Sequence, residues 1–150
     1  MAANVQVVAL PTMRVACLSV RAEHPEGEAL TRLMAWGKER GLLEGYRLFG
    51  YDNCEPHPNH IYTAVLTVGP DVEGDEEVSV TDLEAGVYVM TNITGIPEIG
   101  AGYARLAAWF EESGREFDRR HPFHELEEAL SPLGTPEDAV RMALHLRLVE

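Results

Sequence analysis

A repeated stretch is the feature that most constrains how this chain folds. The segments "MAWGKERG" (34–41) and "AAWFEESG" (107–114) align without a gap when the chain is shifted by 73 residues (34 to 107). The same register extends into apolar runs on both sides, at 14–21 and 87–94 and at 49–53 and 122–126. One register that covers a strand, a helix and the next strand indicates two copies of one supersecondary unit. The identical pairs are Trp36/Trp109, Gly27/Gly100, Arg32/Arg105, Leu33/Leu106, Ala35/Ala108, Glu39/Glu112 and Gly41/Gly114.

Local patterns predict a β-α-β-β order in each copy. Gly41 and Gly114 are placed to end the two helices, because glycine adopts the left-handed conformation without a Cβ clash. The linker "GPDVEGDEEVSVTDLEAG" is acidic and glycine-rich, separates the copies, and contains a short strand near 78–80. The predicted elements are strand 13–22, helix 26–40, strands 46–52 and 61–68, then strand 86–94, helix 98–113 and strands 122–129 and 139–149.

These elements predict a single α+β domain over residues 1–150, with pseudo-repeats at about 5–70 and 82–150. Helices with one apolar stripe must cover one face of an antiparallel sheet. We therefore expect about eight strands with two helices on one face, related by a pseudo-twofold axis. Between the helices the sheet has less cover, which predicts a central cleft, and such internal interfaces favour ligand binding.

Composition limits the class of protein. The formal net charge of −13 repels phosphate backbones, so direct nucleic-acid binding is disfavoured, while cations are attracted. No apolar run is long enough to span a membrane and no secretory signal is apparent, so we expect no membrane partner. Cys17 and Cys54 form no disulfide framework and indicate a reduced, cytoplasmic protein.

Several segments together resemble the GyrI-like small-molecule-binding domain, also called the bacterial transcription-activator effector-binding domain, of the SOUL/GyrI-like fold. They are "MRVA" (13–16), "GYDNCEPHP" (50–58), "LEAGVYVMTNITGIPEIGAGYARLAAWFEESG" (83–114) and "PFHEL" (122–126), and the resemblance covers nearly the whole chain. Such domains sense ligands in some multidrug-responsive transcription regulators and also occur alone. The resemblance implies a central cleft for lipophilic, often cationic, compounds.

The resemblance also implies a key acidic residue on the strand after the second helix, which is Glu125 here. A carboxylate in an apolar cleft is costly to bury alone, and a ligand cation offsets that cost. Aromatic faces would add cation–π attraction of roughly 0.5–2 kcal/mol each. Where the family usually has tyrosine two residues later this chain has Glu127, and Ile61–Thr63 replace the usual Arg-Tyr-Asp. The predicted ligand-binding residues are Glu125, Tyr88, Trp109, Tyr51, Tyr62, Tyr103 and, beside Glu125 across the sheet, His145.

Structural roles compete with these assignments. Asp52, which the ungapped register sets opposite Glu125, is predicted to cap a turn. The glycine-rich segment 95–102 lacks the lysine and hydroxyl residue of a phosphate-binding loop. The histidines near Cys54 do not follow a zinc-binding spacing, so no metal and no cofactor is predicted. A haem or tetrapyrrole site is a weaker possibility, and no axial histidine stands out.

Two classes of function remain. The favoured one is a stand-alone binder or sensor of hydrophobic, cationic small molecules, since the two copies use the length that a helix-turn-helix would need. The alternative is a hydrolase that detoxifies reactive cyclopropane-type compounds, as some relatives do, with Glu125 as general base. A gyrase-inhibitor-like contact with a protein partner is also consistent with the resemblance.

Overall fold

The computed structural model describes residues 4–150, which form two compact units. The first unit is Thr12–Glu84, and the second unit is Ala85–Glu150 together with the N-terminal segment through Pro11. No helix in the described range is long and apolar enough to cross a membrane.

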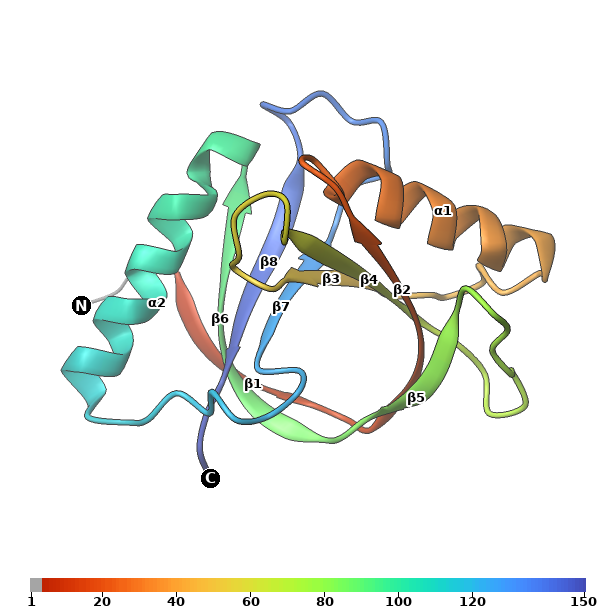
Figure 1. Cartoon of the computed structure of the whole chain (residues 1–150). Coiled ribbons are helices and arrows are strands. Elements are labelled where there is room, and N and C mark those ends of the chain that lie inside the picture. Colours follow the sequence, from red (N-terminus) through yellow and green to blue (C-terminus); the bar gives the residue numbers. More distant parts are fainter. Residues whose placement is uncertain (1–3) are drawn as a thin grey trace. The chain divides into compact units, whose positions relative to one another are not determined.

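The first unit is a four-stranded antiparallel sheet covered by one helix (Figure 1). Its strands lie in the order β5-β2-β4-β3, and α1 packs across β2 and β4. Apolar side chains between helix and sheet are fully buried, among them Leu33, Leu66 and Ala64. The elements are β2 (Met13–Arg21), α1 (Glu26–Glu39), β3 (Leu48–Asp52), β4 (Ile61–Thr67) and β5 (Ser79–Leu83).

The second unit repeats this arrangement with the order β1-β6-β8-β7, again antiparallel throughout. Helix α2 packs on β6, β8 and β1, with Leu106 in a core that includes Val89, Leu144 and Leu146. The predicted α+β class, with eight strands and two helices, is therefore confirmed for residues 4–150. The elements are β1 (Val5–Leu10), β6 (Gly86–Thr94), a 3-10 turn (Ile96–Glu98), α2 (Ile99–Ser113), β7 (Glu125–Ala129) and β8 (Arg141–Arg147).

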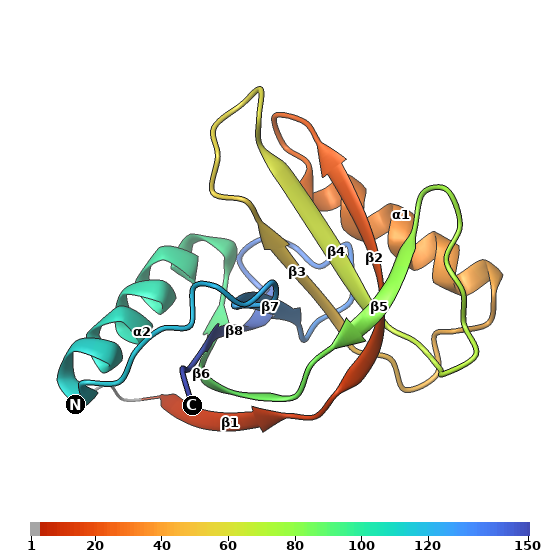
Figure 2. The same ribbon diagram turned by 60° about the horizontal axis from the view of Figure 1, so that its bottom comes forward.

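The sequence prediction missed β1, the strand that leads the first copy, and it placed β5, which leads the second copy, as a short strand near 78–80 in the linker. β1 runs into β2 through two residues, and β5 runs into β6 in the same way (Figure 2). Each leading strand pairs with the other copy: Leu10 of β1 lies opposite Gly86, and Leu83 of β5 lies opposite Met13. The true repeat is thus β-β-α-β-β with its edge strands exchanged, and the predicted β-α-β-β order is incomplete.

The offset between the copies is constant only through the helix. It is 73 residues for β2/β6 (13 to 86), 77 for β3/β7 (48 to 125) and 80 for β4/β8 (61 to 141). The connections of the second unit are longer, so carrying the offset of 73 onto β7 was wrong. The counterpart of Glu125 is Leu48 rather than Asp52, and Asp52 corresponds to Ala129.

The helix ends and one predicted turn agree with the structure. α1 is followed by Gly41 with φ +68°, and α2 by Gly114 with φ +70°, so both glycines occupy the left-handed conformation. The Asp52 carboxylate accepts the Cys54 amide at 2.7 Å, which confirms its turn-capping role. Three predicted strands are shorter than expected, since β3 begins at Leu48, β7 at Glu125 and β8 at Arg141. The predicted central cleft stays a prediction.

Candidate functional site

Two carboxylates of β7 lie on the side of the second unit's sheet that carries α2. Glu125 is directly opposite Leu146 and Glu127 is opposite Leu144, and residues opposite each other share a face. Both leucines belong to the core beneath α2. Glu125 and Glu127 are half-buried, so two acids stand beside an apolar surface without full access to water.

Half-buried aromatic residues surround the same core. Tyr103 of α2 donates its hydroxyl to Glu127 Oε2 at 3.1 Å. Phe110 packs against Phe117, with ring centroids 5.8 Å apart, and Phe117 meets the His124 imidazole at 5.6 Å. All three aromatic residues pack against the core beneath α2 while keeping part of their surface exposed. We call Tyr103, Phe110, Phe117, Glu125 and Glu127 the aromatic–acid strip.

The first unit shows what these positions look like when they serve packing alone. The counterparts of Glu125 and Glu127 are Leu48, which is buried, and Gly50, where a Cβ would overlap the Tyr62 phenol. The counterparts of the α2 residues Tyr103 and Phe110 are Leu30 and Gly37. The aromatic–acid strip is therefore specific to the second unit.

A glycine exchange explains how the strip stays partly open. Gly37 lets α1 approach β4 closely, since a Cβ there would lie 2.8 Å from Leu66 Cδ2. Phe110 occupies this position in α2, and the close approach moves toward the N-terminal half of the helix. There a Cβ on Gly102 would lie 2.7 Å from Leu144 Cδ1 and 2.8 Å from Ile93 Cγ2. α2 consequently packs on β6, β8 and β1, and Tyr103 is the side chain that extends from it to β7.

Two predicted ligand residues lie on the opposite side of the second unit's sheet. Tyr88 is fully buried; its hydroxyl donates to the Phe123 carbonyl at 2.8 Å and accepts from Arg147 Nη1 at 2.9 Å. Burial raises the pKa of Tyr88, and the Arg147 hydrogen bond partly opposes this. The phenol is therefore held neutral and fixed, which is a structural role.

His145 was predicted beside Glu125, and that placement is wrong. The backbone pairing sets His145 opposite Leu126 and Met90, one residue out of step with Glu125, so its ring points to the other face. Its Nδ1 lies 3.1 Å from the Ala143 carbonyl, and its Nε2 lies 4.0 Å from Glu128 Oε1. The acid near His145 is therefore Glu128.

The remaining predicted residues are divided between the units. Tyr51 and Tyr62 belong to the first unit: Tyr62 is buried on its α1 side, and Tyr51 is half-buried on the other side with its pKa raised chiefly by burial. Trp109 meets Phe110 edge-on, with ring centroids 5.4 Å apart. Of the seven predicted residues, the structure thus gathers Glu125, Tyr103 and Trp109 around the α2 side of one sheet.

Sequence reasoning missed Phe110 and Phe117 as candidates. The signal for Phe110 was present in the ungapped register, which sets it against Gly37. Phe117 lies in the longer connection between α2 and β7, where the repeat register is lost.

A duplicated unit of this kind, with acids on β7 and aromatic rings on and after α2 beside one apolar core, fits a small-molecule-binding domain. The model of the GyrI-like small molecule binding domain matches residues 3–139, and the chain belongs to that family.

Solved structures share the fold at low sequence identity. The C-terminal domain of EcmrR superposes with a TM-score of 0.76 at 10% identity, covering 97% of each chain. A hydrolase from Listeria innocua gives 0.68 at 15% identity, covering 97% of this chain and 92% of that one. SAV2435 bound to tetraphenylphosphonium gives 0.59 at 10% identity, covering 97% and 93%. No curated protein matches the chain.

Proposed function

We propose that this chain binds small lipophilic cations at the aromatic–acid strip, with Glu125 and Glu127 attracting the positive charge. The observation that carries the proposal is the contrast between the units: Glu125 and Glu127 stand where the other copy has Leu48 and Gly50. A half-buried carboxylate loses part of its hydration and gains most from a bound cation. The fold relative SAV2435, described as bound to tetraphenylphosphonium, supports the same ligand class.

Each side chain of the strip has a distinct part in this proposal. The Tyr103 hydroxyl holds the Glu127 carboxylate by a charge-assisted hydrogen bond. Phe110 and Phe117 offer aromatic faces to the apolar arms of the ligand, and each cation–π contact contributes about 0.5–2 kcal/mol. The ligand-binding roles of the other predicted residues stay predictions, and these residues are Tyr88, Trp109, His145, Tyr51 and Tyr62.

Titration calorimetry with tetraphenylphosphonium tests the proposal. We expect Glu125→Gln and Glu127→Gln each to weaken binding about tenfold or more, which corresponds to about 1.4 kcal/mol. Glu128→Gln is the matched control, since Glu128 adjoins Glu127 in sequence but lies on the opposite face. We expect that variant to bind within about twofold of wild type.

A neutral compound of similar shape, triphenylphosphine oxide, separates charge recognition from apolar burial. The proposal predicts much weaker binding of this compound and no loss of that weak binding in Glu125→Gln. Equal affinity of wild type, Glu125→Gln and Glu127→Gln for tetraphenylphosphonium would refute the role of the strip.

We propose sensing or sequestration of such a cation as the biological consequence. A chain with a formal charge of −13 is unsuited to direct contact with nucleic acid, so a partner protein would have to transmit any regulatory signal.

A hydrolase is the second candidate, because one fold relative is described as a hydrolase and a carboxylate beside a phenol suits general-base activation of water. In that case Glu125 would take the proton of the attacking water. Incubation with cyclopropane-bearing electrophiles should then release a hydrated product from wild type and none from Glu125→Gln. Product formation at the background rate in wild type would leave binding alone.

A further inference from the structure

The aromatic–acid strip has a positive charge of the chain itself against one of its rings. The guanidinium of Arg119 lies 5.4 Å from the ring centroid of Phe117. Arg119 is exposed and Phe117 is half-buried, and both lie in the connection between α2 and β7 of the second unit. A cation at this distance is attracted by the negative face of the aromatic ring. The Phe117 ring is therefore already in use as a cation-binding face.

The Phe117 ring is held in place from several sides. The backbone of Phe117 forms a β-bridge with Leu148. The Phe110 ring packs against it with centroids 5.8 Å apart, and the His124 imidazole meets it at 5.6 Å. His124 is itself fixed, since its Nδ1 lies 2.7 Å from the His121 carbonyl. The aromatic face is thus a fixed part of the second unit, and what covers it is a separate question.

The Arg119 side chain, by contrast, is held lightly. Its backbone amide donates to the Phe117 carbonyl at 3.1 Å, which keeps the two residues close together. Within residues 4–150, however, the guanidinium of Arg119 takes part in no hydrogen bond and no ion pair. This is notable in a chain with 25 acidic residues and 12 basic ones. The contact with the Phe117 ring is therefore what places the guanidinium, and no directional bond opposes its departure.

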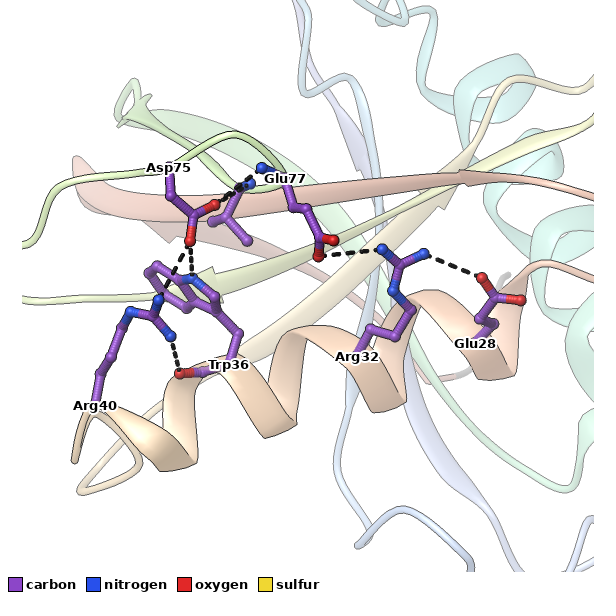
Figure 3. A network of polar contacts seen from close by, with 7 residues as sticks. Glu28, Arg32, Trp36, Arg40, Asp75 and Glu77 are labelled. Carbon is purple, nitrogen blue, oxygen red and sulfur yellow. Dashed lines mark hydrogen bonds and ion pairs between the residues drawn. The ribbon is translucent and has the colours of Figure 1, made fainter.

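The first unit shows a firmly held arginine over a ring (Figure 3). The Arg40 guanidinium lies 4.3 Å from the centroid of the Trp36 ring. Its Nη1 donates to the Trp36 carbonyl at 3.0 Å, and its Nη2 donates to Asp75 Oδ2 at 3.2 Å. The Trp36 indole N–H donates to the same carboxylate oxygen at 2.9 Å, so ring and arginine share one acid. A ligand would have to break these bonds to reach the indole, whereas Arg119 leaves its ring without breaking any.

We propose that Arg119 competes from within the chain for the cation-binding face of Phe117. It covers that face while the strip is empty, and a bound cation takes its place. The inference rests on the proposed function and adds how ligand binding is regulated at the same site. A ligand cation gains more than Arg119 loses, since it also meets the half-buried carboxylates of Glu125 and Glu127. A cation that reaches only the ring gains nothing over Arg119, so the strip selects lipophilic cations over simple ammonium ions.

Titration calorimetry with tetraphenylphosphonium measures the competition. Arg119→Gln should bind this cation about threefold to fivefold more tightly than wild type, the ratio expected when an exposed cation–π contact no longer covers the ring. Arg120→Gln is the matched control, because Arg120 is exposed, carries the same charge one residue further on and makes no ring contact within the described residues. That variant should stay within about 1.5-fold of wild type. Equal gains in the two variants would mean that only the net charge matters, and would overturn the proposal.

A double-mutant cycle shows whether the effect passes through the ring. Phe117→Leu keeps an apolar side chain and removes the aromatic face. In that background Arg119→Gln should change the affinity for tetraphenylphosphonium by less than about 1.5-fold, because no ring remains for the guanidinium to cover. Thermal melting checks that each variant is folded. A full gain from Arg119→Gln in the absence of the ring would show that Arg119 acts elsewhere, and the proposal would be wrong.

Proton NMR follows Arg119 in the wild-type protein, without any variant. In the absence of ligand, the δ protons of Arg119 should lie upfield of those of Arg120, because the Phe117 ring shields them. Saturation with tetrabutylammonium, which has no ring of its own, should move them toward the Arg120 position. Bound cation with the Arg119 protons still shielded would show that the guanidinium stays on the ring, which contradicts displacement.

The outcomes separate this inference from the proposed function. Equal affinities of Arg119→Gln and wild type, together with weaker binding by Glu125→Gln, would overturn the role of Arg119 and leave the strip as the cation site. Absence of tetraphenylphosphonium binding in wild type and in every variant would refute the proposed function, and the competition with it.

Discussion

Tyr88 provides a direct test of how the second unit is held together. Its hydroxyl sits at the centre of a buried chain of contacts: it accepts from Arg147 Nη1, and it donates to the Phe123 carbonyl. Arg147 in turn donates to the Ala85 carbonyl at 2.8 Å and lies 3.8 Å from Asp118. Tyr88→Phe removes one oxygen atom, leaves the ring in place and deletes both hydrogen bonds of the hydroxyl.

The expected cost follows from the two bonds. A buried neutral hydrogen bond contributes about 0.5–1.5 kcal/mol, and one to a charged group about 1.5–3 kcal/mol. Their loss predicts a decrease of about 2–4 kcal/mol in the free energy of unfolding. For a chain of this length, 1 kcal/mol corresponds to about 2–4 °C, so Tm should fall by about 5–15 °C.

Urea denaturation followed by circular dichroism measures this difference. Tyr46→Phe is the matched control, because Tyr46 is 39% exposed; that variant should stay within about 0.5 kcal/mol of wild type. An equally small effect in Tyr88→Phe would refute the reasoning, since the two hydrogen bonds would then contribute nothing that water cannot replace.

Two further predictions concern α1 and the cysteines. Gly37→Ala should destabilise the chain by about 1–2 kcal/mol in the same urea assay, because its methyl group would meet a β4 leucine. Gly27→Ala, in the first turn of the same helix, faces open space and should be neutral or stabilising. Equal effects of the two substitutions would argue against close packing at Gly37. Burial raises the pKa of Cys17 to about 11, so at pH 8 a thiol reagent should modify exposed Cys54 rapidly and Cys17 only after unfolding. The stability that Cys17 contributes as a neutral thiol should be lost as the pH rises between about 9 and 11. Rapid labelling of both thiols in folded protein would contradict this.

The parts of the fold that the sequence predicts well are those fixed by neighbours along the chain. The two helices and the strands before them agree with the structure to within a residue or two, because apolar spacing and the stops at Gly41 and Gly114 are local signals. β1 could not be found in this way. It is an edge strand of six residues, and its partner β6 lies about 80 residues further on, so no nearby pattern specifies the pairing.

In the candidate site, too, local sequence signals predict some features and contacts between distant segments decide the others. The two-residue period of a strand sets Glu125 and Glu127 on one face, and the pairing of β7 with β8 agrees with it. The position of His145 depends on the register between β7 and β8, and that register depends on the length of their connection. The prediction that His145 lies beside Glu125 was therefore wrong. The accessibility of the strip depends on where α2 crosses the sheet, and this follows from the close approach at Gly102, a tertiary effect of one missing Cβ.

A duplicated chain carries its own control for such effects, because each position of one copy can be compared with the other under the same backbone geometry. Identical pairs, such as Leu33 and Leu106, say only that both copies need a core. Where the first copy has close packing at Leu48 and Gly37, the second copy has the Glu125 carboxylate and the half-buried Phe110 ring, which cost stability unless they serve another purpose. The first unit retains the closed packing, so the second can accommodate these residues and still fold. Differences between the copies, more than their shared residues, are therefore the basis on which we propose where the protein meets its ligand.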